Sequence, residues 1–124
     1  MAPVRVLLVD DAEEARRDLR AALSLFDGIE IVGEAPNGAE ALRLTESLQP
    51  DILLMDLEMP FMDGYEAAQR IKSKYPARKI VALTVHDYES AREKAKQSGV
   101  DAFLVKGAPV KTIVQAILNS TSVA

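Results

Sequence analysis

The run Ile52-Leu53-Leu54-Met55-Asp56, four apolar residues closed by an aspartate, decides the fold. It is one of five short apolar runs that recur at regular spacing along the 124 residues. The other four span Val4–Val9, Ile29–Val32, Ile80–Leu83 and Ala102–Val105. Most of these runs are nearly continuous in Val, Ile and Leu instead of alternating with polar residues. Such continuity indicates strands buried on both faces, as in a parallel sheet.

Between these runs, apolar residues recur at the spacing of helix faces. The five predicted faces comprise Ala15, Leu19, Ala22, Leu23 and Phe26; Ala41, Leu44 and Leu48; Tyr65, Ala68, Ile71 and Tyr75; more weakly Tyr88, Ala91 and Ala95; and Val110, Ile113, Val114 and Ile117. Alternating strands and helices, joined by right-handed crossovers, predict an α/β doubly wound three-layer sandwich. The connections are short, so we expect one domain over residues 1–124.

Local signals predict where several helices begin and end. Capping-box spacing, a small-residue helix end and a proline at a first helical position are all present. The capping-box pairs are Asn37 with Glu40 and Asp63 with Glu66. The helix end is Ser98-Gly99, and the proline is Pro109. The small, polar segment from Asn119 to Ala124 is expected to be a frayed terminus or the start of a linker.

Composition excludes several functional classes. Fifteen basic residues against 19 acidic ones give a net charge of −4, which argues against a free-standing binder of nucleic acid or of anionic membranes. No apolar run approaches the roughly 18 residues of a membrane span. There is no cysteine, which excludes disulfides, thiolate metal sites and cysteine nucleophiles. The first residues show no leader pattern, so we expect a cytoplasmic protein.

Polar side chains follow four of the five predicted strands. They are Asp10 and Asp11, Asp56, Thr84, and Lys106. In open parallel sheets, ligands bind at the carboxyl ends of the strands. We therefore expect three carboxylates, one hydroxyl and one ammonium group to converge on one edge of the sheet. Each could instead have an ordinary structural role: Asp11, with Glu14 three positions on, has the spacing of a helix cap. The combination on four strand ends favours a functional site.

The grouped charges indicate a cation. Two carboxylates about 4 Å apart repel by roughly 4 kcal/mol at an effective dielectric constant of 20. A few carboxylates plus waters suit Mg²⁺, whereas one histidine and no cysteine disfavour softer metals. An ammonium and a hydroxyl beside such a metal suit an anion with several oxygens, such as a phosphoryl group.

Four motifs carry a family resemblance. They are Leu8-Val9-Asp10-Asp11, Leu54-Met55-Asp56-Leu57-Glu58-Met59-Pro60 with Asp63-Gly64, Ala82-Leu83-Thr84, and Phe103-Leu104-Val105-Lys106. Together they resemble the receiver domain of bacterial two-component response regulators, in particular the chemotaxis regulator. The resemblance covers essentially the whole chain. It implies a flavodoxin-like sheet in the strand order 2-1-3-4-5.

The resemblance also implies a phosphorelay function. Asp56 would accept a phosphoryl group from a phosphohistidine on a sensor histidine kinase or a phosphotransfer protein. Asp10, Asp11, Asp56 and the backbone carbonyl of Glu58 would hold Mg²⁺, for which Mn²⁺ could substitute, and Lys106 would pair with a phosphoryl oxygen. The chain would then be no enzyme beyond catalysing its own phosphorylation and dephosphorylation.

Further residues would transmit or tune the signal. Thr84 would donate its hydroxyl to the phosphoryl group, which opens space for Phe103, the switch aromatic, to turn inward. Glu58 and His86, at positions that flank the path of the hydrolytic water, would set the lifetime of the phosphorylated form. Many receivers have proline where this chain has Gly107, which leaves the geometry after Lys106 open.

Several alternatives remain. A flavodoxin-like electron carrier disagrees with the acidic first loop, and an aspartate-nucleophile phosphohydrolase would want aspartate where Glu58 stands. A phosphorylation-independent pseudo-receiver disagrees with the intact set of site residues. The output partner is either a separate effector protein or a helix-turn-helix DNA-binding domain from which this receiver is excised, and we favour a stand-alone receiver. A phosphorylation-dependent homodimer is a further option; no direct binding of nucleic acid or membrane by this chain is expected.

Overall fold

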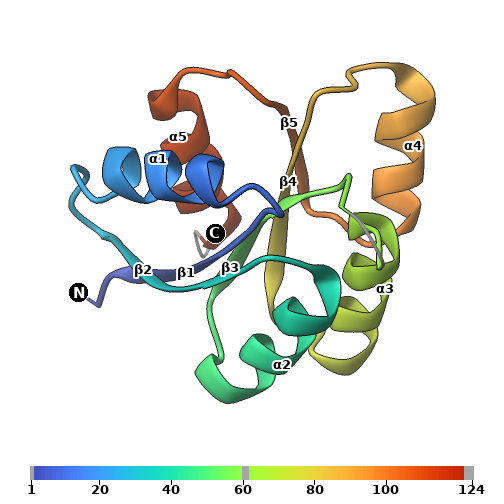
Figure 1. The fold of residues 1–124 in the computed structure, drawn as a ribbon, viewed down its shortest axis with the longest axis horizontal. Helices are drawn as coiled ribbons and strands as arrows, with labels where there is room; N and C mark the ends of the chain where they lie inside the picture. The colour runs from blue at the N-terminus through green and yellow to red at the C-terminus, as the bar shows by residue number, and fades with distance from the viewer. Residues whose placement is uncertain (1, 60–61, 122–124) are drawn as a thin grey trace.

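The computed structural model describes residues 2–59 and 62–121, so Pro60 of the third-strand motif lies outside the described residues. Strands and helices alternate along the chain as expected (Figure 1). The elements are β1 (Val4–Val9), α1 (Glu13–Leu23), β2 (Ile29–Ala35), α2 (Gly38–Leu48), β3 (Ile52–Asp56), α3 (Gly64–Lys74), β4 (Lys79–Thr84), α4 (Glu89–Gln97), β5 (Ala102–Val105) and α5 (Val110–Thr121).

The five strands form one parallel sheet in the order β2-β1-β3-β4-β5, which confirms the predicted topology. The register aligns the carboxyl ends of neighbouring strands: Val9 pairs with Met55, and Thr84 pairs with Val105. The residues that follow these strands therefore emerge at one edge of the sheet, as the sequence predicted.

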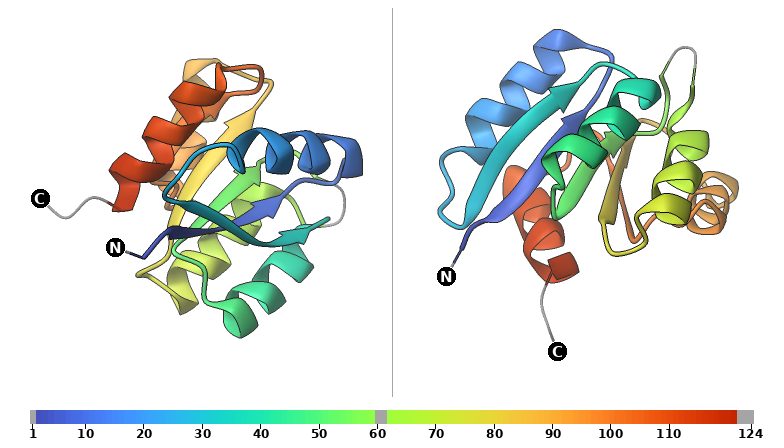
Figure 2. Two further views of the ribbon diagram at one scale, coloured as in Figure 1. Left: turned by 90° about the vertical axis from the view of Figure 1, so that its left-hand side faces the viewer. Right: turned by 90° about the horizontal axis from the view of Figure 1, so that it is seen from below.

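Helices cover both faces of the sheet, with α1 and α5 on one face and α2, α3 and α4 on the other (Figure 2). Successive residues of the central strands point to opposite faces. One core layer contains Leu7, Val9, Leu53 and Met55 against α2 and α3, and the other contains Val6, Leu8, Ile52 and Leu54 against α1 and α5. Burial on both sides explains why β1 and β3 are apolar at nearly every position.

Two capping predictions are confirmed and one alternative is excluded. Asn37 Oδ1 accepts from the Glu40 amide at 2.9 Å, and Asp63 Oδ1 accepts from the Glu66 amide at 2.8 Å. The alternative role of Asp11 as a helix cap is wrong, because the residue before α1 is Ala12, whose position has no side-chain cap. Asp11 thus remains available to the site.

Some predicted boundaries were wrong. The strand β2 continues past Val32 to Ala35, because its backbone still pairs with Leu8 and Val9 after a register shift in β1. The helix α1 ends at Leu23, so Phe26 packs against the core from the following turn. The predicted polar tail is helical through Thr121 at the end of α5, and residues 122–124 lie outside the described residues.

Candidate functional site

Three carboxylates meet where β1 and β3 end. Asp10 and Asp56 are 4% and 5% exposed, and Asp11 beside them is exposed to solvent. Each of the three offers an oxygen, and these oxygens lie within 4.8 Å of one another. Oxygen donors from several carboxylates, with one side open to water, fit a Mg²⁺ ion, which keeps part of its hydration shell.

The local backbone fixes two of these carboxylates. Asp10 Oδ1 accepts a hydrogen bond from the Ala12 amide at 2.9 Å, and Asp56 Oδ1 accepts one from the Glu58 amide at 3.0 Å. Each aspartate therefore uses one oxygen to order the loop that follows its strand. The second oxygen of each points to Lys106, whose Nζ lies 3.0 Å from both Asp10 Oδ2 and Asp56 Oδ2.

The ammonium of Lys106 thus bridges the two buried carboxylates. Burial raises the pKa of Asp56 above its ordinary 3.8, and the neighbouring Asp10 charge adds to this, although the Glu58 amide and Lys106 act in the opposite direction. Burial alone would lower the pKa of Lys106, but its hydrogen bonds to Asp56 and Asp10 together outweigh burial and raise that pKa. The site therefore holds a fixed cation, Lys106, beside Asp56, whose ionised form is disfavoured by burial.

Thr84 lies at the same edge of the sheet, but its hydroxyl is turned to a neighbouring loop. It is fully buried, and its Oγ1 donates to Glu58 Oε1 at 2.8 Å. The same Oγ1 accepts from the His86 amide at 3.1 Å, and His86 Nε2 lies 2.8 Å from Glu58 Oε2. The structure therefore brings together three of the four residues that the family resemblance assigned to tuning and switching. It joins them by direct hydrogen bonds that their sequence positions did not indicate.

Phe103, the predicted switch aromatic, lies half-buried on β5. Its ring packs beside Leu57, Ala82 and Ala95, and the Arg92 guanidinium carbon lies 4.8 Å from the ring centroid. Arg92 in turn pairs with Asp87 at 2.6 Å. A charged side chain of α4, that of Arg92, therefore covers the Phe103 ring. The family resemblance predicts that the ring leaves this position and turns inward on phosphorylation.

The turn after Lys106 resolves a question that the sequence left open. No cis peptide bond occurs among the described residues, so Lys106–Gly107 is trans. Gly107 has a φ of +91°, which glycine adopts without steric cost, and no atom would lie within 4 Å of a Cβ there. The glycine thus provides a tight turn that returns the chain to α5.

Sequence reasoning missed Arg16. Its NH1 donates to the Asp10 carbonyl at 2.5 Å and its Nε pairs with Glu34 Oε1 at 3.1 Å, while Arg20 holds the other oxygen of Glu34 at 2.8 Å. This network ties α1 and β2 to the backbone of the acidic loop. The signal available in the sequence was the pair Arg16 and Arg20, which lie one helical turn apart in α1 and face Glu34 on the edge strand β2.

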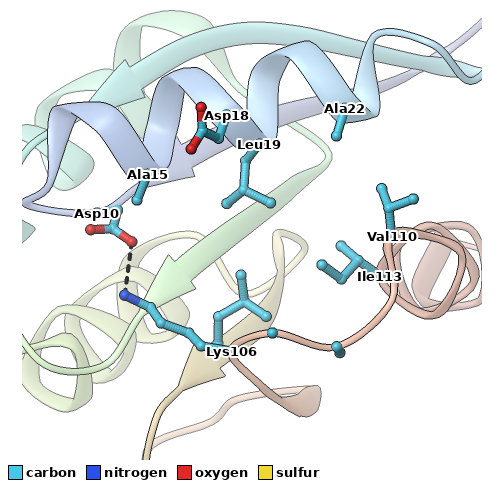
Figure 3. A pocket seen from close by; sticks show the side chains of 11 residues that line it. Asp10, Ala15, Asp18, Leu19, Ala22, Lys106, Val110 and Ile113 are labelled. Carbon is cyan, nitrogen blue, oxygen red and sulfur yellow. Dashed lines mark hydrogen bonds and ion pairs between the residues drawn. The ribbon is translucent and has the colours of Figure 1, made fainter.

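A cavity of about 320 Å³ lies beside the site, between α1 and α5. Figure 3 shows Asp10 and Lys106 at one end of this cavity, while Leu19, Val110 and Ile113 provide apolar walls. The ammonium of Lys106 can therefore be approached from the α1–α5 face.

Comparison with known proteins identifies the family. The model of the response regulator receiver domain matches residues 6–118. The chain is 37% identical over 114 residues to the response regulator GacA of Pseudomonas viridiflava and 38% identical over 115 residues to the response regulator protein VraR of Staphylococcus saprophyticus. These matches cover 92% and 93% of this chain but 53% and 55% of the relatives. The chain therefore spans about half the length of these relatives.

Solved structures agree with this match. The signal receiver domain of the response regulator NarL from Mycobacterium tuberculosis superimposes with a TM-score of 0.91 at 35% identity, over 96% of each chain. The response regulator domain of Thermotoga maritima CheB gives a TM-score of 0.90 at 26% identity, over 98% of each chain. With the acidic cluster and its bridging lysine in place, this chain belongs to the response regulator receiver domain family.

Proposed function

We propose that Asp56 is the phosphoacceptor of this receiver domain and that it takes its phosphoryl group from a phosphohistidine of a sensor histidine kinase or phosphotransfer protein. The observation that carries the proposal is the contact of Lys106 Nζ with both Asp10 Oδ2 and Asp56 Oδ2. This contact places a fixed positive charge where a phosphoryl group on Asp56 would develop negative charge.

Each residue has a defined part in the transfer. A carboxylate oxygen of Asp56 attacks phosphorus, the new O–P bond forms as the P–N bond to histidine breaks, and the leaving imidazole takes up a proton. Lys106 then exchanges its contact with Asp56 Oδ2 for a phosphoryl oxygen. Asp10, Asp11, Asp56 and the Glu58 backbone carbonyl would hold Mg²⁺, or Mn²⁺ in its place. The metal supplies charge neutralisation of the transferring group.

The proposed output is a change of surface rather than turnover of a separate substrate. Thr84 would donate to a phosphoryl oxygen, and Phe103 would move inward as the surface around α4, β5 and α5 rearranges. Glu58 and His86 would set the lifetime of the acyl phosphate through the water that hydrolyses it. The chain would catalyse only its own phosphorylation and dephosphorylation.

The downstream partner has two candidate forms. A similar structure, 26% identical with a TM-score of 0.89, is described as a DNA-binding response regulator of the LuxR family from Staphylococcus aureus. Together with the half-length coverage of GacA and VraR, this favours an output domain that binds DNA. The other candidate is a separate protein, which is either an effector or a second copy of this chain in a homodimer formed on phosphorylation. We also propose that these events take place in the cytoplasm. Separately, among the described residues, no helix has the length and apolar character needed to cross a membrane.

Intact mass after incubation with acetyl phosphate and Mg²⁺ tests the proposal. We expect one added phosphoryl group on the wild type, none on Asp56→Asn, and none on the wild type when Mg²⁺ is replaced by EDTA. An adduct of equal yield on Asp56→Asn would assign the phosphoryl group to another residue. No adduct on the folded wild type would support a phosphorylation-independent pseudo-receiver instead.

A further inference from the structure

The carboxylate of Glu58 joins the loop after β3 to the loop after β4. Its Oε1 accepts from the Thr84 hydroxyl at 2.8 Å, and its Oε2 lies 2.8 Å from His86 Nε2. The Glu58 and His86 side chains are 40% and 48% exposed, so their mutual contact contributes little by itself. Thr84, by contrast, is fully buried, and its hydrogen bond to Glu58 starts from the protein interior.

The Thr84 hydroxyl has one proton to donate. In this structure that proton goes to Glu58, while the oxygen accepts from the His86 amide. The proposed function requires the same proton for a phosphoryl oxygen on Asp56. Glu58 and the phosphoryl group therefore compete for one donor, and they cannot both hold it.

We propose that Glu58 is a positioning residue that holds Thr84 in its unphosphorylated orientation, so that phosphorylation must break the Thr84–Glu58 hydrogen bond. This inference rests on the proposed function of Asp56. It adds that the stability of the phosphorylated state depends on a side chain whose own contacts are with Thr84 and His86. It also makes the loss of this bond the first step by which the signal leaves the site.

The structure provides a route for that signal. His86 contacts Tyr88, with ring centroids 5.5 Å apart, and Tyr88 directly precedes α4. Glu58, His86 and Tyr88 line a cavity of about 360 Å³ together with Tyr65, Ser90, Ala91 and Lys94. This space allows Glu58 to swing away from Thr84 without displacing the core. Release of Thr84 removes one partner from Glu58 and so loosens the contact of His86 with the start of α4.

The experiment must separate the effect of the Glu58 charge on binding from the effect of its hydrogen bond to Thr84, because a carboxylate also repels an anion at Asp56. A double-mutant cycle between Glu58→Ala and Thr84→Val does this. The valine has nearly the shape of threonine and lacks the hydroxyl, so the repulsion by Glu58 persists in that background while the hydrogen bond does not. Glu66→Ala, which removes an exposed carboxylate of α3 that pairs with Arg70, serves as the matched charge control.

The test measures the Kd of beryllofluoride, a phosphoryl analogue, with saturating Mg²⁺ in all these variants. We expect Glu58→Ala to bind roughly fivefold tighter than the wild type, as the loss of one competing hydrogen bond implies. In the Thr84→Val background the same substitution should change the Kd less than twofold, and so should Glu66→Ala in the wild type. Equal gains in both backgrounds, or no gain in either, would overturn the role of Glu58.

An NMR readout without the analogue supplies a second test. In Glu58→Ala, the amide signals of Val85, His86 and Tyr88 should move toward their positions in beryllofluoride-bound wild type. Signals that stay at the free wild-type positions would contradict the proposed release. A folded wild type that fails to bind beryllofluoride would instead refute the proposed function of Asp56, so the two failures are distinguishable.

Discussion

Asp56 is a buried acid whose charged form is disfavoured when no metal is bound, because burial raises its pKa above 3.8. An acid whose pKa is higher in the folded than in the unfolded state makes the protein less stable as pH rises through that interval. We therefore expect Asp56→Asn to be more stable than the wild type at pH 7 in EDTA, by about 1 kcal/mol.

Urea unfolding of both proteins at pH 7 and at pH 3.5 measures this difference. The advantage of Asp56→Asn should shrink at the lower pH, where a larger fraction of the wild-type carboxyl is protonated in both states. A wild type at least as stable as the variant at pH 7 would show that Lys106 fully compensates the buried charge.

Glu34 has the opposite dependence on pH. Burial acts to raise its pKa, but hydrogen bonds from Arg20 and Arg16 and their charges together lower the pKa below 4.5. A lowered carboxyl pKa stabilises the fold above about pH 4.5, and this stabilisation is lost as pH falls through the folded-state value. We expect Glu34→Gln to lose roughly 1 kcal/mol at pH 7 and little at pH 3.

Thermal unfolding of Glu34→Gln across this pH range checks the prediction. Glu40→Gln is the control, since Glu40 also pairs with an arginine, Arg43, but both members of that pair lie within α2. Equal losses in both variants would mean that the Arg16 contact with Asp10 adds nothing.

Individual site residues could be predicted from sequence to different degrees. Asp10 and Lys106 follow β1 and β5, and Asp56 ends β3, so the shared carboxyl edge of the parallel sheet brings these residues to one side of the molecule. The hydrogen bond between Glu58 and Thr84 could not be predicted, because it depends on how the loop after β3 folds back toward β4. Arg16 was missed for a related reason: its contact with the Asp10 carbonyl depends on the rotation of α1 about its axis.

At the scale of elements, α3 begins directly against the loop that carries Glu58. The Gly64 amide donates to the Leu57 carbonyl at 2.9 Å. A Cβ at this position would lie 2.6 Å from the Asp56 carbonyl oxygen and closer still to Leu57 Cα. Because these are backbone atoms, a side chain at Gly64 must displace either α3 or the end of β3.

We therefore expect Gly64→Ala to lower the stability by about 1–3 kcal/mol and to slow phosphorylation, because the Asp56 backbone moves. Gly28→Ala is the control, since Gly28 has a φ of +88° but no atom within 4 Å of a Cβ. It should lose about 1 kcal/mol and keep its phosphorylation rate. Chemical denaturation and the acetyl phosphate reaction measure both quantities; a wild-type rate in Gly64→Ala would show that α3 yields instead of β3.

Strand boundaries were predicted well where the apolar run is uninterrupted, and less well in β2, where polar residues and glycine interrupt it. The strands β1 and β5 have the predicted bounds, each ending directly before a charged residue, Asp10 or Lys106. The strand β2 extends through Gly33 and Glu34, which interrupt the apolar run. A Cβ at Gly33 would lie 2.8 Å from Leu48 Cδ1 of α2, so a side chain there would displace the end of the Leu48 side chain.

At the scale of the whole molecule, the three layers followed from the alternation of periods and the handedness of crossovers, whereas the strand order followed from the family resemblance. The proposed metal site belongs to this scale too, since β1 and β3 must both be in place to bring its carboxylates together. A ligand that binds only the folded state stabilises it by RT ln(1 + [L]/Kd). We expect Mg²⁺ at a hundred times its Kd to raise the free energy of unfolding by about 2.7 kcal/mol.

Thermal unfolding in a Mg²⁺ titration measures this effect. Asp56→Asn and Asp10→Asn should each lose most of the stabilisation, whereas Glu66→Gln should keep it. A rise in melting temperature of equal size in Asp10→Asn would place the metal outside the acidic cluster.

Lys106 bridges Asp10 and Asp56, which lie 96 and 50 positions before it in the chain. Contacts of such long sequence separation form late, since the intervening chain must be ordered first. A partly folded chain that has aligned β1 and β3 but not yet β5 carries the repelling carboxylates without the ammonium between them. Addition of the last strand thus relieves a repulsion that the earlier strands create, and only a chain folded through β5 presents a complete acceptor to its phosphodonor.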